Sequence, residues 1–339
     1  MRAGTELPPL EVVDFALFGL AALSMSDNIE ITVDQPVSAS AARQIAMLAH
    51  VYHAFALVNI APLRLDLTNI VADPSPIATG RKIVCFSGGA DSTAGAVEAV
   101  TRHGYTHALL IAGADYPSAD HPGFIDLRVR VGRMADRLGL GLVTVETDIR
   151  ALRVNWRMTH ALCIAMCLHA HGAVFDAGGF GADTSDLADL VCHPWGMSNG
   201  LIDTLGTALL PVDLFNRTLW RPERLARIIS HDPALARDLA VCWVDTRSSG
   251  NCGTCQKCLR TRMNLQSLGF DASGMFAQTP DLLATVRALD VPASFTSIRL
   301  ELSRMSEVHH FMPAGPLRTA VGLHVEQLRE AYVAIMPSR

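Results

Sequence analysis

The chain has 339 residues, half of them hydrophobic, and a formal net charge of −5. This amount of apolar side chain excludes an intrinsically disordered protein, and the length allows two domains or one elaborated domain. A weakly acidic chain is not expected to bind nucleic acid or an anionic membrane surface. The apolar stretch 12–25 contains Asp14 and is shorter than a membrane-spanning helix, so it predicts a buried helix in a cytoplasmic protein.

Residues 1–79 predict an α/β extension at the N-terminal side of the chain. Alternating apolar residues predict strands at 28–33 and 63–67, and helical spacing predicts a helix over 39–55. A turn-rich segment at 73–76 separates this extension from the core of the chain.

Residues 80–270 predict a core in which strands and helices alternate. Strands are expected at 82–86, 108–113, 141–146 and 174–177, and helices at 91–103, 124–138 and 157–171. This alternation indicates an α/β fold with a doubly wound parallel sheet, covered by helices on both faces. Residues 271–339 predict a C-terminal helical region, with its clearest helix at 326–335.

The hexapeptide Ser-Gly-Gly-Ala-Asp-Ser at 87–92 lies between an expected strand and an expected helix. Gly88 and Gly89 allow a tight turn, so that several backbone N–H groups can point at one anion beside the helix N-terminus. Asp91 is a natural Mg²⁺ ligand beside a polyphosphate. The hydroxyl groups that can add hydrogen bonds are those of Ser87, Ser92 and Thr93.

The same hexapeptide lacks the lysine of a Walker loop, so we do not expect transfer of a terminal phosphoryl group. A glycine-rich strand-to-helix turn with a capping serine is the plain structural alternative. The complete hexapeptide after a buried strand favours a phosphate site over that alternative.

Cys252, Cys255 and Cys258 place three thiols within seven residues, and Cys242 lies ten positions upstream. Two C-x-x-C turns can direct thiolates at one ion, and four sulfurs satisfy tetrahedral zinc. An iron–sulfur cluster on the same ligands and chance clustering of buried cysteines are the alternatives. We therefore predict one structural Zn²⁺ per chain.

The hexapeptide resembles the Ser-Gly-Gly-x-Asp-Ser signature of the PP-loop ATP pyrophosphatases. The spacing of the four cysteines, followed by Leu259 and Arg260, is similar to the zinc tail of the 7-cyano-7-deazaguanine synthases, the QueC-like members of that superfamily. Local matches at 114–116, 148–149 and 178–183 follow the second, third and fourth expected strands. The resemblance covers roughly residues 80–270.

This resemblance implies a PP-loop fold and an AMP-forming ligase, with ATP, Mg²⁺ and Zn²⁺ as cofactors. A carboxylate or carbonyl oxygen of a small-molecule, nucleobase-like substrate would take the adenylyl group from ATP, and ammonia would then displace AMP. The resemblance implies catalytic roles for Asp91, Ser92 and Asp183, and a nucleotide-binding role for Asp115. Either Asp115 or Asp183 is a candidate to take the proton from ammonia.

The chain departs from the resemblance where those enzymes bind their nucleobase. The segment 184–193 is not recognisable, and Pro117 and Ser118 replace a glycine and a glutamine. Residues 1–79 and 271–339 have no counterpart in the short members. The chemistry is therefore expected to carry over, whereas the acceptor stays open, and a homodimer is compatible with the sequence.

Two alternative functions stay open. One is sulfur transfer from a sulfur donor to an adenylated purine or tRNA base, and the other is a nucleotide-binding regulatory protein without turnover. A sulfur carrier is an exposed cysteine with a lowered pKa. Cys85, Cys163 and Cys167 are expected in the core, which leaves only Cys192 as a carrier. We therefore favour nitrogen over sulfur.

Two groups of arginines are candidates for binding an anion. Arg260 and Arg262 follow the cysteines and would be held by the metal site. The segment 217–227 is instead interpreted as a solvated helix face, because Glu223 interrupts its positive charges; its arginines are Arg217, Arg221, Arg224 and Arg227.

Overall fold

The computed structural model describes residues 2–3, 9–55, 60–75, 78–191, 195–242 and 250–335. Within them, six strands form the main sheet, in the order β1-β8-β7-β6-β9-β10. Five of these strands are parallel and only β1 is antiparallel, at the β8 edge. The bounds are β1 Arg2–Ala3, β6 Lys82–Cys85, β7 His107–Ala112, β8 Gly141–Glu146, β9 Ala177–Gly181 and β10 Val212–Phe215. The expected parallel sheet is confirmed.

The strand order reverses beside β6. The chain runs from β6 outward through β7 to β8, and then returns to place β9 on the other side of β6. The loops that follow β6 and β9 therefore lead away from each other, in opposite directions, at the carboxyl edge of the sheet. A crevice at such a reversal is where open α/β sheets bind ligands.

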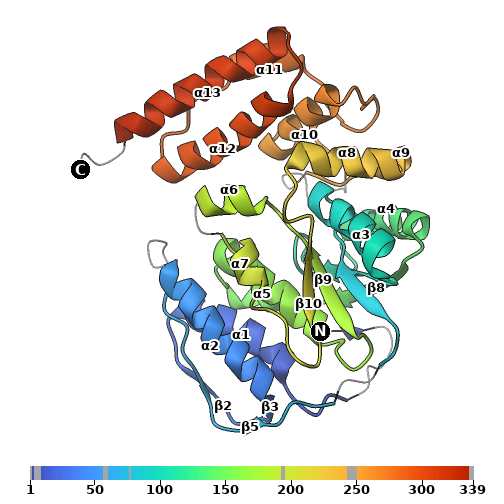
Figure 1. The fold of residues 1–339 in the computed structure, drawn as a ribbon, viewed down its shortest axis with the longest axis vertical. Coiled ribbons are helices and arrows are strands. Elements are labelled where there is room, and N and C mark those ends of the chain that lie inside the picture. Colours follow the sequence, from blue (N-terminus) through green and yellow to red (C-terminus); the bar gives the residue numbers. More distant parts are fainter. Residues whose placement is uncertain are drawn as a thin grey trace.

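Helices cover both faces of the sheet (Figure 1). On one face lie α3 (Ala90–His103), α4 (Pro122–Leu138) and α8 (Arg221–His231), which share a core with Val84 and Leu110. The neighbouring residues Ile83 and Leu109 face the opposite core, which holds α5 (Trp156–His169) and α7 (Asn199–Ile202). This alternation follows from the two-residue period of a strand.

The fourth core strand lies further along the chain than predicted. The prediction of a strand at 174–177 is wrong, because β9 spans Ala177–Gly181 and consists mainly of glycine. A Cβ at Gly95 of α3 would lie 2.7 Å from the Cα of Gly181, and a Cβ at Gly181 would lie 2.4 Å from the carbonyl oxygen of Asp91. The glycines therefore bring the start of α3 against β9, and packing overrides their low strand propensity.

The N-terminal residues share the second core with the sheet. Helix α1 (Asp14–Asp27) packs on α5 beside α2 (Ala39–Ala54), and its Leu17 and Phe18 join Leu109 and Phe180 in one cluster. The expected strands at 28–33 and 63–67 appear as β2 and β4, which pair in parallel, and a second pair is β3 with β5. Their bounds are β2 Ile31–Val33, β3 Val37–Ser38, β4 Leu65–Leu67 and β5 Ile70–Val71.

The last described residues are helical, as predicted. Helices α12 and α13 pack together with α11 around a third core cluster, which also takes Leu259 and Met263 from α10 (Figure 1). Because α10 also contains Cys258, this unit is joined to the cysteine segment. The remaining helices are α6 Asp186–Val191, α9 Pro233–Arg237, α10 Gln256–Ser267, α11 Leu282–Arg287, α12 Phe295–Phe311 and α13 Pro316–Ile335, with a 3₁₀ turn at Ile149–Leu152.

Candidate functional site

The glycine-rich hexapeptide forms the turn between β6 and α3. Gly88 has a positive φ of 74°, which a glycine adopts without strain, and Gly89 is the N-cap of α3. The Ser87 and Ser92 hydroxyls lie 3.1 Å apart, and the Ser92 hydroxyl donates to the carbonyl of Gly89 at 3.1 Å. The two serines thus close the turn across its ends.

This turn leaves a group of backbone donors unpaired. No described residue accepts a hydrogen bond from the N–H groups of Gly88, Gly89, Ala90 or Asp91. Helix α3 adds the positive end of its dipole at the same place, which favours an anion there. The Thr93 hydroxyl is buried and also lacks a partner among the described residues. The turn therefore offers the donors that a phosphate group requires.

Asp91 is held by two buried arginines. Its Oδ1 lies 3.0 Å from Arg224 Nη1 and its Oδ2 lies 3.2 Å from Arg221 Nη1. The Arg224 side chain is completely buried and that of Arg221 is 6% exposed. The interpretation of these two arginines as part of a solvated helix face is therefore wrong.

The physical reason is the position of α8, which packs on α3. Arg221 and Arg224 lie on the same helical stripe as the buried Leu225 and Ile228. This spacing of three, four and seven residues is a signal that sequence reasoning missed. The solvated interpretation does fit Arg217, whose side chain is 41% exposed and which pairs with Asp186 and Asp203 at the surface.

Asp91 does not present a free oxygen to a metal ion. Both carboxylate oxygens already pair with guanidinium groups, and the charge of a magnesium ion would repel both arginines. Within the described residues, the four cysteines are the only group found with the ligand types and spacing of a metal site. The residues at the turn therefore do not fit the magnesium ion expected from the sequence.

Asp183 follows β9 and joins the same charge cluster. Arg224 Nη1 donates to the Asp183 carbonyl at 2.8 Å while it also contacts Asp91. Burial opposes ionisation of Asp183, but nearby positive charges outweigh it and lower the pKa of Asp183 to about 2; they are Arg221, Lys257, Arg260 and Arg304. A carboxylate with so low a pKa is a weak proton acceptor at neutral pH.

Asp115 lies elsewhere on the carboxyl edge. It is exposed in the turn that follows β7, and it is not among the residues that line the cavity beside Asp183. The structure thus brings Asp91 and Asp183 together through Arg224 and leaves Asp115 apart from them.

A cavity of about 70 Å³ lies between this charge cluster and the C-terminal helices. Asp183, Arg221 and Arg224 form one wall, and Arg260 of α10 contributes another part. Helix α12 forms the opposite wall with five residues that sequence reasoning assigned no role: Thr296, Leu300, Ser303, Arg304 and Glu307. Burial, together with Arg221 and Arg304, lowers the pKa of Arg260 to about 9.

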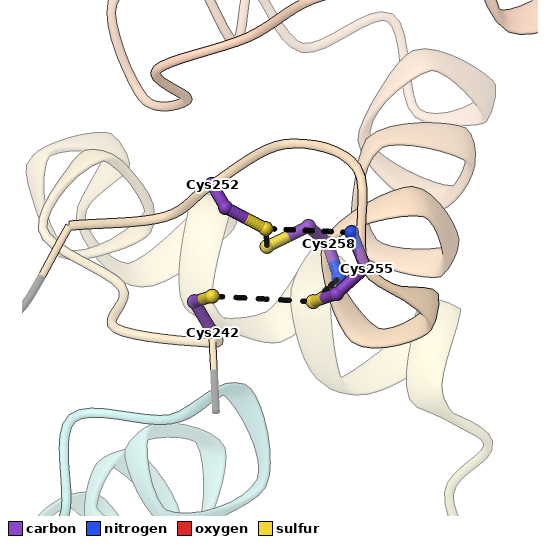
Figure 2. A group of neighbouring side chains, drawn as sticks. All are labelled: Cys242, Cys252, Cys255 and Cys258. Carbon is purple, nitrogen blue, oxygen red and sulfur yellow. Dashed lines mark hydrogen bonds between the residues drawn. The ribbon is translucent and has the colours of Figure 1, made fainter. Parts of the chain in front are cut away.

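The four predicted cysteine ligands come together in the structure (Figure 2). Their sulfur atoms all lie within 4.8 Å of one another, with 4.0 Å between Cys242 and Cys255 and 3.9 Å between Cys252 and Cys258. Four sulfurs at zinc bonding distance are about 3.8 Å apart in a tetrahedron. The group is therefore compatible with zinc.

Backbone N–H groups of the cysteine segment donate to two of the sulfur atoms. The N–H of Cys255 donates to Cys252 Sγ at 3.3 Å, and the N–H of Cys258 donates to Cys255 Sγ at 3.5 Å. Burial disfavours the Cys252 thiolate, but hydrogen bonds from the Cys255 N–H and from the N–H and hydroxyl of Thr254 prevail and lower the pKa of Cys252 to about 6. Burial raises the pKa of Cys255 and Cys258. Four sulfur ligands would leave no position for water, which is the arrangement of a structural zinc site.

Arg262 has a structural role and does not line the cavity. Its guanidinium donates to the carbonyls of Gly253 and Pro280, at 3.1 and 2.5 Å. Gly253 has a φ of 88°, and a Cβ there would lie 1.7 Å from the carbonyl oxygen of Gln278. Of the two arginines singled out after the cysteines, only Arg260 faces the cavity.

The remaining cysteines lie largely in the core. Cys163 and Cys167 are buried, as predicted, and burial raises the pKa of both thiols to about 12. Burial also raises the pKa of Cys85. Cys192, the predicted sulfur carrier, lies outside the described residues.

Comparisons with known proteins found no match of the chain to a protein-family model, to a curated protein or to a solved structure. In the described part of the chain, no helix has the length and apolar character needed to cross a membrane. The assignment of a function therefore depends on the geometry of the two candidate sites.

Proposed function

We propose that this protein is an AMP-forming ligase of the PP-loop type. It would bind the phosphates of ATP at the turn 87–92, so that an oxygen of a small carboxylate or carbonyl substrate attacks the α-phosphorus and pyrophosphate leaves. Ammonia would then attack the activated carbon, lose a proton and expel AMP. The zinc-compatible cysteine group would stabilise the fold and take no part in this reaction.

The observation that carries this proposal is the unpaired donor group at the reversal of the sheet. Four N–H groups that have no acceptor among the described residues, the Ser87 hydroxyl and the start of α3 meet beside β6, where the strand order reverses. The turn contains no lysine, which supports binding of pyrophosphate over transfer of a terminal phosphoryl group.

The choice of nitrogen over sulfur rests on the described cysteines. Four of them form the zinc-compatible group, and burial raises the pKa of the other three. A raised pKa disfavours the thiolate that accepts and delivers sulfur. Ammonia needs no carrier residue, so the described thiols favour the nitrogen reaction.

The test is product analysis with a substrate acid labelled with ¹⁸O in its carboxylate. We expect AMP and pyrophosphate, with one labelled oxygen transferred to AMP. Ser92→Ala should slow pyrophosphate release by about tenfold or more, since it removes the hydroxyl that closes the turn. Thr101→Ala, also on α3 but exposed and bonded only to the Val97 carbonyl, is the matched control.

ADP and phosphate as the main products would refute the proposal. A sulfur-containing product that disappears in Cys192→Ser, while pyrophosphate release persists, would support the sulfur alternative. Nucleotide binding without any turnover over a panel of acids and purines would support the regulatory alternative.

A further inference from the structure

The cavity beneath α12 is lined by a mixture of charges that nearly cancel. Five arginines and three carboxylates line it, and Asp91 lies directly behind Arg221 and Arg224. The excess is therefore one positive charge, or two if the exposed Lys257 near Asp183 is included. The lining arginines are Arg157, Arg221, Arg224, Arg260 and Arg304, and the carboxylates are Asp183, Asp189 and Glu307.

Two of these arginines form no close contact with an acidic group. Within the described residues, the guanidinium groups of Arg260 and Arg304 form no ion pair or hydrogen bond. The Nε of Arg221 is also buried without a hydrogen-bond partner in this part of the chain. Asp183 acts on both guanidinium groups only through space. A partly buried guanidinium without a hydrogen-bonded counter-ion is costly, so the arrangement favours an anion from outside the chain.

Carboxylates already present oppose a ligand with many negative charges. Asp183 and Glu307 both line the cavity, and Glu307 accepts a hydrogen bond from the backbone N–H of Arg221. A polyphosphate carries several negative charges and would be repelled by these carboxylates. A single carboxylate matches the small positive excess.

The rest of the lining indicates a flat and partly apolar ligand. Two indole rings, Trp195 and Trp220, line the cavity together with Leu300 and Ala188. Arg157 already lies over the Trp195 ring, at 5.7 Å from its centroid. A cavity of about 70 Å³ is small, which favours a small acid over a whole nucleotide.

We propose that this cavity binds the carboxylate of a small planar acid, with Arg260 and Arg304 as its ligands. Helix α12 then determines specificity, because it contributes Arg304, Leu300 and Ser303 to the wall that faces the core. The identification of this acid as the acceptor of the adenylyl group rests on the proposed function. Binding of the acid in the cavity is independent of that function.

Calorimetry with benzoate tests the proposal on the full chain, without ATP or magnesium. We expect benzoate to bind and the neutral benzamide to bind at least about tenfold more weakly. Inorganic pyrophosphate should not compete. Because the measurement involves no turnover, its failure is distinguishable from failure of the ligase reaction.

Two variants of α12 should change the affinity in opposite directions. Arg304→Gln should weaken benzoate binding by about tenfold, because the positive charge that pairs with the carboxylate is removed. Arg304→Lys restores a positive charge and should recover part of the affinity. Glu307→Gln should strengthen binding, because it removes a negative charge and keeps a hydrogen-bond acceptor for Arg221. Arg329→Gln on α13, which loses only a surface pair with Glu326, is the control and should leave binding unchanged.

Thermal unfolding of each variant checks that it is folded. Absence of benzoate binding, equal binding of benzamide, displacement by pyrophosphate, or loss of affinity in Glu307→Gln as large as that in Arg304→Gln would each overturn the proposal.

Discussion

The cysteine group and the glycine-rich turn hold their key side chains in different ways. All four sulfur atoms come from residues 242–258, so local turns assemble most of that site. The turn contains Asp91 within its hexapeptide, but the arginines that neutralise Asp91 are 130 and 133 residues away in the sequence. A local site can be found by its spacing, whereas a site completed by distant residues depends on the packing of the fold.

Loss of a cysteine ligand should have the largest effect. We expect Cys255→Ser to abolish stoichiometric zinc and to lower the free energy of unfolding by roughly 5 kcal/mol or more, because structural zinc contributes on the order of 10 kcal/mol to folding. Metal analysis and urea unfolding measure both effects. Cys163→Ala, a buried cysteine outside the group, should keep the metal. Iron with sulfide, or full stability without metal, would contradict the assignment.

Removal of one buried arginine should have the next largest effect. Arg224→Met leaves Asp91 with one partner in a largely buried place, at an expected cost of about 3–5 kcal/mol. Arg217→Met removes surface pairs and should cost at most about 1 kcal/mol. Urea unfolding of both variants makes the comparison. The double variant Asp91→Asn with Arg224→Met should lose less than the sum of the two single losses; simple additivity would show that the pair is not coupled.

The low pKa of Asp183 predicts the smallest of the three effects. Its pKa is about 2 in the folded chain, against an ordinary value of 3.8, so the carboxylate stabilises the fold above the ordinary pKa. This contribution, on the order of 2 kcal/mol, should be lost as the pH falls through about 2. Unfolding of the wild type and Asp183→Asn between pH 5 and pH 2 measures it. A difference in unfolding free energy between the two proteins that stays constant over this range would show that the pKa of Asp183 is not lowered.

Local structure could be predicted from the sequence where pattern and packing agree. Strand β8 has the predicted bounds, β6 ends one residue earlier than predicted, and β7 is shifted by one residue toward the N-terminus. The four cysteines were recognisable because metal ligands need fixed spacing. In contrast, β9 was missed because Ala-Gly-Gly-Phe-Gly has little intrinsic strand preference, and only the close approach of α3 explains it.

The cavity could not be predicted for a similar reason. Arg304 and Glu307 lie on an ordinary amphipathic helix, and nothing in the sequence states which part of the core α12 covers. The burial of Arg221 and Arg224 was detectable from the sequence, since they share a helical stripe with Leu225 and Ile228. A buried arginine on an apolar stripe indicates an acidic partner, but the identity of Asp91 follows only from the fold.

The packing of α1 on α5 has a consequence for the order of folding during synthesis. Gly19 lies against Met166, and the ring of Phe18 lies 4.7 Å from that of His169. Ribosomes add about 5–20 residues per second, so α1 leaves the ribosome on the order of ten seconds before its partner helix exists. During that interval α1 can pack only on the nearby elements α2 and β4. The N-terminal core therefore stays incomplete until α5 has been made.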